Sequence, residues 1–163
     1  MANTQSMCTS FMQQLMVGEH QLGTATLVSR TSLTAPTTDT LKAALYLASA
    51  TMNAASTVYT VTGEVSGTGY VAGGVTVTNA TAPNSTNASA TAGVAFFTPS
   101  ASITYTTVTL ATAFDAVLLY NSTQSNKAIS VHTFGSQTIT AGTFTLTMPS
   151  NTTTTALIRL ATT

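Results

Sequence analysis

Few side chains in this sequence of 163 residues can carry out acid–base, nucleophilic or metal chemistry. The candidates are four acids, two histidines and one cysteine: Glu19, Asp39, Glu64, Asp115, His20, His132 and Cys8. Nucleophilic catalysis needs a serine, threonine or cysteine beside a base, and that base is usually histidine. Alternation along residues 129–134 places His132 on one face of a strand with Ser130 and Phe134, where it could act as a general base. The favoured interpretation is a half-exposed histidine of a sheet.

Paired carboxylates are the second chemistry to consider, and Glu64 with Asp115 is the only pair worth naming. Nothing in the sequence brings the two together. We expect Glu64 to accept hydrogen bonds from loop amides or to pair with an arginine, and Asp115 to anchor a loop or an interface. His20 follows a short helix and is expected near its last carbonyls. No spacing of His, Cys, Asp or Glu indicates a metal site, so the sequence predicts no catalytic, cofactor-binding or metal-binding residues.

The charge balance bears on the kind of partner. Four basic and four acidic residues give a net charge of zero, and charged residues make up 5% of the chain against about 25% in ordinary soluble domains. Four scattered cations cannot form the basic patch that nucleic-acid binding needs. The longest apolar runs, 41–50 and 113–120, are shorter than the ~20 residues of a membrane helix. Without a signal-like N-terminus, we expect synthesis in the cytoplasm and no membrane partner. The charge balance predicts no nucleic-acid partner and favours a surface covered by neighbouring subunits.

The N-terminal region is expected to be an arm followed by a short docking helix, together residues 1–20. Within residues 10–18, the apolar side chains recur at helical spacing, and Gly18 can end the helix. The candidate partner-binding residues are those of this stripe: Phe11, Met12, Leu15 and Met16. An isolated helix this short is marginal in water, so it must dock. Docking on its own sheet and docking on a neighbouring subunit are both open.

The remainder, residues 21–163, has the pattern of an all-β domain. Threonine accounts for 38 residues and stands largely in short alternating runs. Expected strands, eight to ten in all and short, include 41–48, 57–64, 75–78, 93–98, 103–110, 114–120, 129–134, 143–148 and 156–161. Changes of parity at Thr106–Thr107 and Ala141–Gly142 predict β-bulges or, at the second, a tight turn. Residues 31–40, 63–74 and 79–92 are expected loops. The fold class predicted is an antiparallel β-sandwich, jelly-roll-like, with the short N-terminal helix and arm.

Several segments also resemble, in one order, a widespread family of small structural proteins of tailed bacteriophages and prophages. They are SFMQQLMVGEH (10–20), LKAALYL (41–47), YTVTGEVSGTGYVAGG (59–74), AVLLYNS (116–122) and FTLTMP (144–149). The glycine-rich turn is the most specific part, and residues 24–40 and 79–92 match poorly. The resemblance implies a virion component, with no catalytic residues to carry over.

The functional expectation is a capsid decoration, or cement, protein that binds the outer shell in many copies and stabilises it. Its partners would be the major capsid protein or other virion proteins, and it would be a homo-oligomer located in the virion. A neck, tail or fibre-base component is an alternative. A carbohydrate-binding sandwich on the virion surface is another, although the sequence has no tryptophan to stack on a sugar and its tyrosines fall mostly within strands.

Overall fold

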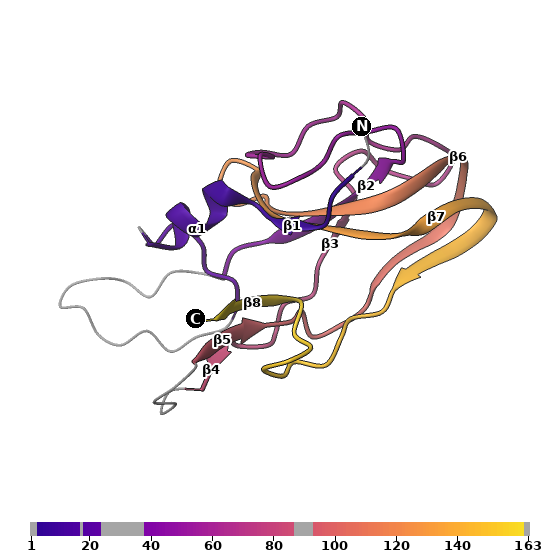
Figure 1. Ribbon diagram of the computed structural model, residues 1–163. Helices are drawn as coiled ribbons and strands as arrows, with labels where there is room; N and C mark the ends of the chain where they lie inside the picture. Colours follow the sequence, from indigo (N-terminus) through magenta and orange to yellow (C-terminus); the bar gives the residue numbers. More distant parts are fainter. Residues whose placement is uncertain (1–2, 17, 24–37, 87–92, 162–163) are drawn as a thin grey trace.

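The computed structural model describes residues 3–16, 18–23, 38–86 and 93–161 (Figure 1). Within these ranges the chain forms one short helix and eight strands. In chain order they are β1 (Ser6–Met7), α1 (Thr9–Met16), β2 (Leu41–Leu47), β3 (Val75–Thr76), β4 (Asn84–Ser85), β5 (Val94–Phe97), β6 (Ile103–Asn121), β7 (Lys127–Leu146) and β8 (Ile158–Ala161). The short apolar run 41–47 is therefore a strand, as expected.

Two antiparallel sheets make up the fold. The larger has the order β1-β7-β6-β2-β3 and the smaller the order β4-β5-β8. Figure 1 shows the larger sheet above the smaller one, with the ribbon of β6 and β7 curling beyond both at the right. The expectation of an all-β, sandwich-like fold with one short helix is confirmed.

The β6–β7 ribbon is longer than the sequence analysis expected, since the two strands have 19 and 20 residues. The register shifts between Tyr105 and Val108, where Thr107 has a φ of 54°. A second irregularity lies opposite, where Ala141 has a φ of 47° and β7 continues past it. Both parity changes are bulges, which bend a strand without ending it, so segments expected as separate short strands are continuous.

The larger sheet is buried on both faces. On the upper face, residues 48–74 cross over the strands, and the Tyr46 and Tyr120 hydroxyls donate to the carbonyls of Thr60 and Gly73 at 2.5 and 2.7 Å (Figure 1). The lower face looks toward the smaller sheet and carries Val117 and Leu119, both buried. Two buried faces explain why the central strands read as nearly continuous apolar runs.

The strand expected over 57–64 is wrong. This segment makes only isolated bridges to the sheet, Val58 with Lys127 and Tyr46 with Glu64. Val58 and Val61 are exposed, so the alternation here does not correspond to a buried face. The segment instead lies across the sheet as part of residues 48–74, which form the loop layer. It thereby places Glu64 over the strands.

The N-terminal residues belong to the fold. β1 pairs with β7 at the sheet edge, with Ser6 opposite Val131, so two residues of the expected arm, Ser6 and Met7, form an edge strand. Cys8 and Phe11 have no exposed surface. The helix occurs where expected and is followed by Gly18, whose φ is 74°. It packs on its own sheet, against β7. Most of the loop expected at 31–40, and the end of the one at 79–92, lie outside the described residues.

We predict that Gly74→Ala lowers the free energy of unfolding by more than about 2 kcal/mol. Gly74 has a φ of 67°, and a Cβ there would overlap the carbonyl oxygen of Ala43 on β2. Gly135→Ala is the control, because no atom lies within 4 Å of its added Cβ, and its effect should stay within about 0.5 kcal/mol. Urea denaturation of both variants measures the difference. Equal stabilities would contradict the assigned backbone.

Candidate functional site

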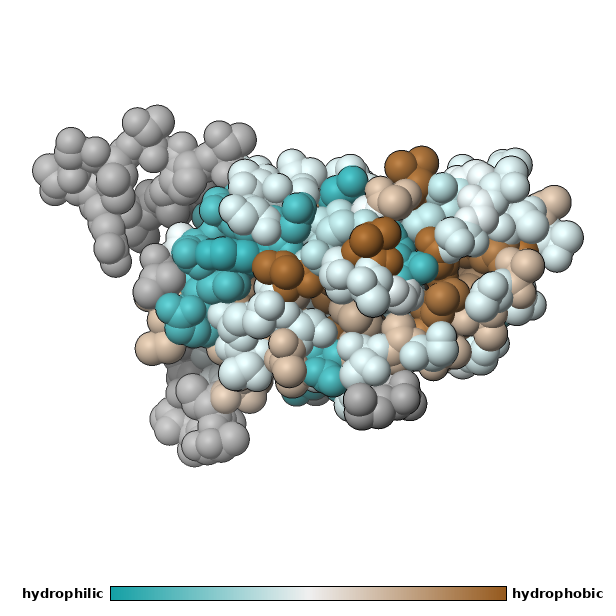
Figure 2. Space-filling model, turned by 90° about the horizontal axis from the view of Figure 1, so that it is seen from above, coloured by the Kyte–Doolittle hydropathy of each residue, from teal (hydrophilic) through white to brown (hydrophobic). Residues whose placement is uncertain are grey.

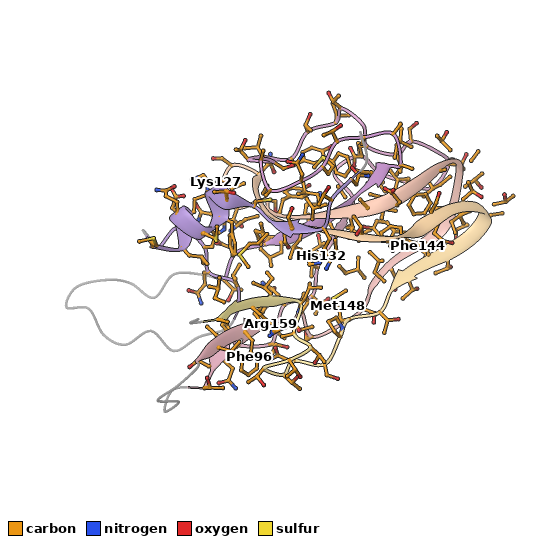
Figure 3. The ribbon with its side chains drawn as sticks, in the orientation of Figure 1. Phe96, Lys127, His132, Phe144, Met148 and Arg159 are labelled. Atoms are coloured by element: carbon orange, nitrogen blue, oxygen red, sulfur yellow. The ribbon has the colours of Figure 1, made fainter. Side chains whose placement is uncertain are left out.

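Ser130 and His132 form a hydrogen-bonded pair on the lower face of the larger sheet. The Ser130 Oγ and the His132 Nε2 are 2.8 Å apart. The two side chains share a face of β7, as the alternation predicted, and Figure 3 shows His132 on the side of β7 that looks toward β8. Ser130 is buried, with 3% of its surface exposed.

Two hollows meet at His132. The inner one has a volume of about 130 Å³ and lies between apolar side chains of both layers, among them Val117, Met148 and Leu157. The outer one, about 320 Å³, opens between β1 and β8 and is lined by Ser130 and Arg159 as well as His132. No acid lines either hollow in the described part of the chain. The third member of a Ser-His-acid arrangement is therefore missing from this geometry.

The electrostatics of the pair limit what it can do. Burial lowers the pKa of His132 from 6.5 to about 4, so its imidazole is neutral at pH 7 but a weak proton acceptor. A general base works best when its pKa lies near the working pH. The geometry therefore fits an internal hydrogen bond that satisfies a buried serine hydroxyl better than an activated nucleophile.

Glu64 is a buried acid in the loop layer. Its Oε1 accepts hydrogen bonds from the Tyr70 hydroxyl at 2.7 Å and from the Gly73 amide at 2.8 Å, and its Oε2 accepts one from the Tyr59 hydroxyl at 2.6 Å. The hydrogen bond from the Gly73 amide is one of the two roles that the sequence predicted for Glu64. Among the described residues, its other hydrogen-bond partners are two tyrosines and no arginine. Three donors make a carboxylate that is 7% exposed tolerable in this position.

The tyrosines around Glu64 hold the loop layer on the sheet. Tyr59 stacks on Tyr120 with ring centroids 4.9 Å apart, and Tyr70 stacks on Tyr105 at 6.0 Å. Burial, followed by the charge of Glu64, raises the pKa of Tyr120 to about 12, so the cluster keeps its hydroxyl protons at neutral pH. Tyr46, Tyr105 and Tyr120 are buried, so they offer no surface for stacking a sugar.

Asp115 belongs to a third group of contacts. Its Oδ1 accepts a hydrogen bond from the Asn3 side-chain amide at 2.5 Å, and the Asn3 Oδ1 accepts one from the Met52 amide at 2.9 Å. Asp115 thus anchors the N-terminal segment, in line with the loop-anchoring role expected. Glu64, Asp115 and His132 share no hydrogen bond in the described structure, so the paired-carboxylate hypothesis has no geometric support.

The four candidate partner-binding residues of α1 divide by exposure. Phe11 is fully buried and Leu15 is partly buried. Met12 and Met16 are exposed, at 45% and 88%. The stripe seen in the sequence therefore turns toward the fold on one side and leaves two methionines on the surface.

An apolar hollow of about 230 Å³ adjoins this helix. It lies between the end of α1, the segment after it and the smaller sheet, and its lining includes Leu15, Leu22, Phe96 and Leu160. Leu160, at the open edge of β8, is also exposed. In the view from above, Figure 2 shows a teal, hydrophilic region on the left, pale side chains over much of the rest, and brown side chains in several spots. The helix and the hollow beside it form one candidate contact surface, named the docking face: Met12, Leu15, Met16, Leu22 and Leu160.

Sequence analysis missed a polar network at the same end of the molecule. Asn121, at the end of β6, contacts both His20 and Asp39. His20 contacts the side chain of Gln14 instead of the helix carbonyls expected. These groups are as many as 101 positions apart, and no local pattern in the sequence signals the contact.

The described residues include one cysteine, Cys8, which is free and buried. Burial raises the pKa of the Cys8 thiol to about 11, so it is not a reactive thiolate at neutral pH. No cluster of three potential metal ligands occurs among the described residues. Nor does the described part contain a helix long and apolar enough to cross a membrane.

Comparison with known proteins gives no match: no family model, no curated protein and no solved structure is similar to this chain.

We predict that Glu64→Gln lowers the free energy of unfolding by about 1–3 kcal/mol, because the new amide group places a donor against donors in a buried site. Glu19→Gln is the matched control. Glu19 forms a more exposed ion pair with Lys127 at 2.5 Å, and such pairs contribute about 0–1 kcal/mol. Urea denaturation at neutral pH compares the two. A larger loss in Glu19→Gln would show that the Glu64 cluster does not hold the loop layer.

We also predict that stability falls in acid because of His132. Its pKa is about 4 in the folded chain and 6.5 ordinarily, so the unfolded chain binds the proton first. The stability linked to this group is complete above pH 6.5 and is lost as the pH falls toward 4, in total by about 3 kcal/mol. His132→Gln removes the titrating group and should flatten this part of the pH profile in urea denaturation. Parallel profiles for variant and wild type would refute the assignment.

Proposed function

We propose that this chain is a structural protein of a bacteriophage particle, a decoration protein that binds the outer shell and stabilises it. The observation that carries the proposal is the docking face, where exposed methionines of α1 stand beside an apolar hollow. Methionine is a flexible apolar side chain suited to protein contacts. The order of segments that resembles phage structural proteins supports the same class.

The scarcity of charge agrees with this role. A chain with four cations and four anions has little electrostatic protection against association, which suits a protein packed among neighbours. Standard protein interfaces bury about 1,600 Å², more than one short helix can offer. We therefore place the docking face at the centre of a larger contact, made with the major capsid protein and with further copies of this chain.

A neck, tail or fibre-base position would use the same face and differs in copy number. Decoration requires a number of copies comparable to that of the major capsid protein, whereas a neck or tail ring requires only the few copies set by its symmetry. The carbohydrate-binding alternative finds less support, because the tyrosines it would use are engaged with Glu64 and the sheet.

The test uses particles of the phage or prophage that encodes the chain, produced without it. Purified wild-type protein added back should co-sediment with these particles in a copy number comparable to the major capsid protein. The Met12→Asp, Met16→Asp double variant should bind at least about tenfold more weakly, because it places two charges in an apolar contact. Both residues are exposed, so folding should change little.

Val61→Asp, Val71→Asp is the matched control. These valines are 69% and 73% exposed and belong to the loop layer, away from the docking face. This double variant should bind like the wild type. If the valine variant lost binding and the methionine variant kept it, the contact with the particle would lie on the loop layer and not on the docking face. Failure of the wild-type protein to bind, together with its absence from native particles, would end the proposal.

A further inference from the structure

The amide of Asn121 has a fixed orientation. Its Oδ1 accepts hydrogen bonds from the backbone N–H groups of Thr123 and Gln124, each at 3.1 Å. A backbone N–H can only donate, so the atom it meets must be the amide oxygen. Asn121 is fully buried, and its Nδ2 accordingly faces the other way, toward Asp39 and His20.

The orientation of the Asn121 amide determines which ring nitrogen of His20 carries the proton. The Asn121 Nδ2 lies 2.6 Å from the Asp39 Oδ2 and 2.9 Å from the His20 Nδ1. An NH₂ group only donates, so the Nδ1 of His20 must accept and carry no proton. The proton of the neutral ring is then on Nε2, which donates to the Gln14 Oε1 at 2.8 Å. Only the neutral imidazole with its proton on Nε2 satisfies both contacts.

A second proton on His20 would place an N–H donor at Nδ1 against the NH₂ donor of Asn121. The charged groups that face the ring act in both directions: Asp39 and Glu19 favour the proton, and Lys127 opposes it. Burial opposes it most strongly, and the pKa of His20 is lowered from its ordinary 6.5. Protonation therefore takes place more readily when the ring has left this position.

His20 also holds the last turn of α1. Its partner on the helix is Gln14, which is 8% exposed. If the ring moved away, the Gln14 Oε1 would lose the hydrogen bond that it accepts from His20. The ring of Phe11 packs against His20 with centroids 4.9 Å apart. His20 is in addition part of the wall of the apolar hollow, together with Leu15 and Leu22. Movement of this one ring thus changes the end of the helix and the hollow at once.

We propose that His20 is a pH-sensitive latch: its neutral ring fixes the last turn of α1 to Asn121 of β6, and a second proton releases that turn. Within the proposed function, on which this consequence rests, acid would disorganise the docking face around Met16 and weaken binding to the shell. The latch itself is a property of the isolated chain.

Hydrogen exchange of single amides, followed by NMR, tests the latch in the full chain. The amides to observe are those of Gly18 and Glu19, which donate to the Leu15 and Gln14 carbonyls at the end of α1. Their protection factors should fall by up to about tenfold per pH unit below about pH 6.5, until the pKa of the closed state is reached. Amides in the middle of β6 exchange through global unfolding and also report the acid-linked loss from His132, so the response of Gly18 and Glu19 is compared with that of the same two amides in the His20→Gln variant.

His20→Gln is the decisive variant. A glutamine amide can accept from Asn121 and donate to Gln14 as the neutral ring does, but it does not titrate. Protection of Gly18 and Glu19 should then be independent of pH. His132→Gln is the matched control and should keep the wild-type response of these two amides. Unchanged wild-type protection in acid, or the same loss in His20→Gln, would overturn the latch.

A direct reading of the ring covers the case in which His20→Gln does not fold. The ¹⁵N shifts of the wild-type imidazole at neutral pH should identify Nε2 as the protonated nitrogen, and a proton on Nδ1 would refute the argument. The latch and the proposed function fail separately. A pH-dependent latch in a chain that binds no particle leaves the latch standing, and pH-independent amides in a chain that coats particles leave the function standing.

Discussion

The ribbon of β6 and β7 imposes the constraint on which the rest of the structure depends, because it is apolar on both faces where it crosses the larger sheet. Neither face can be left to water, so each needs a cover. The smaller sheet covers one face and the loop layer the other. A loop layer has no ladder of its own to hold it, and Glu64 supplies the fixed point: one carboxylate gathers two tyrosine hydroxyls and the Gly73 amide above the strands.

The same constraint explains how polar groups are distributed. Those inside the fold are paired locally, Ser130 with His132 on one face and Glu64 with its tyrosines on the other. At the open end of the sheet, α1 and the segment after it complete the cover through the Asn121 network. The helix thereby has a structural side, which carries Phe11, and an outer side, which carries Met12 and Met16. The proposed docking role uses the outer side together with the apolar hollow beside the helix.

This division gives the proposed assembly function a physical form. The loop layer is anchored by the three hydrogen bonds of Glu64, whereas the end of α1 is held through the His20 imidazole. A protein that binds a shell benefits from a rigid body that carries a small adjustable contact. The latch would place the adjustable part where the exposed apolar side chains are.

The sequence by itself determined the class and several local features. Apolar runs predicted buried strands, the parity changes at Thr107 and Ala141 predicted bulges, and the helix before Gly18 was correctly located, because these signals are local in the chain. It failed at 57–64, where threonine-rich alternation belongs to a loop without a buried face. Only the tertiary structure decided that Phe11 is buried while Met16 is exposed, and that the buried amide of Asn121 lies against the His20 ring. Those outcomes depend on contacts between residues far apart in sequence, for which one sequence carries no periodic signal.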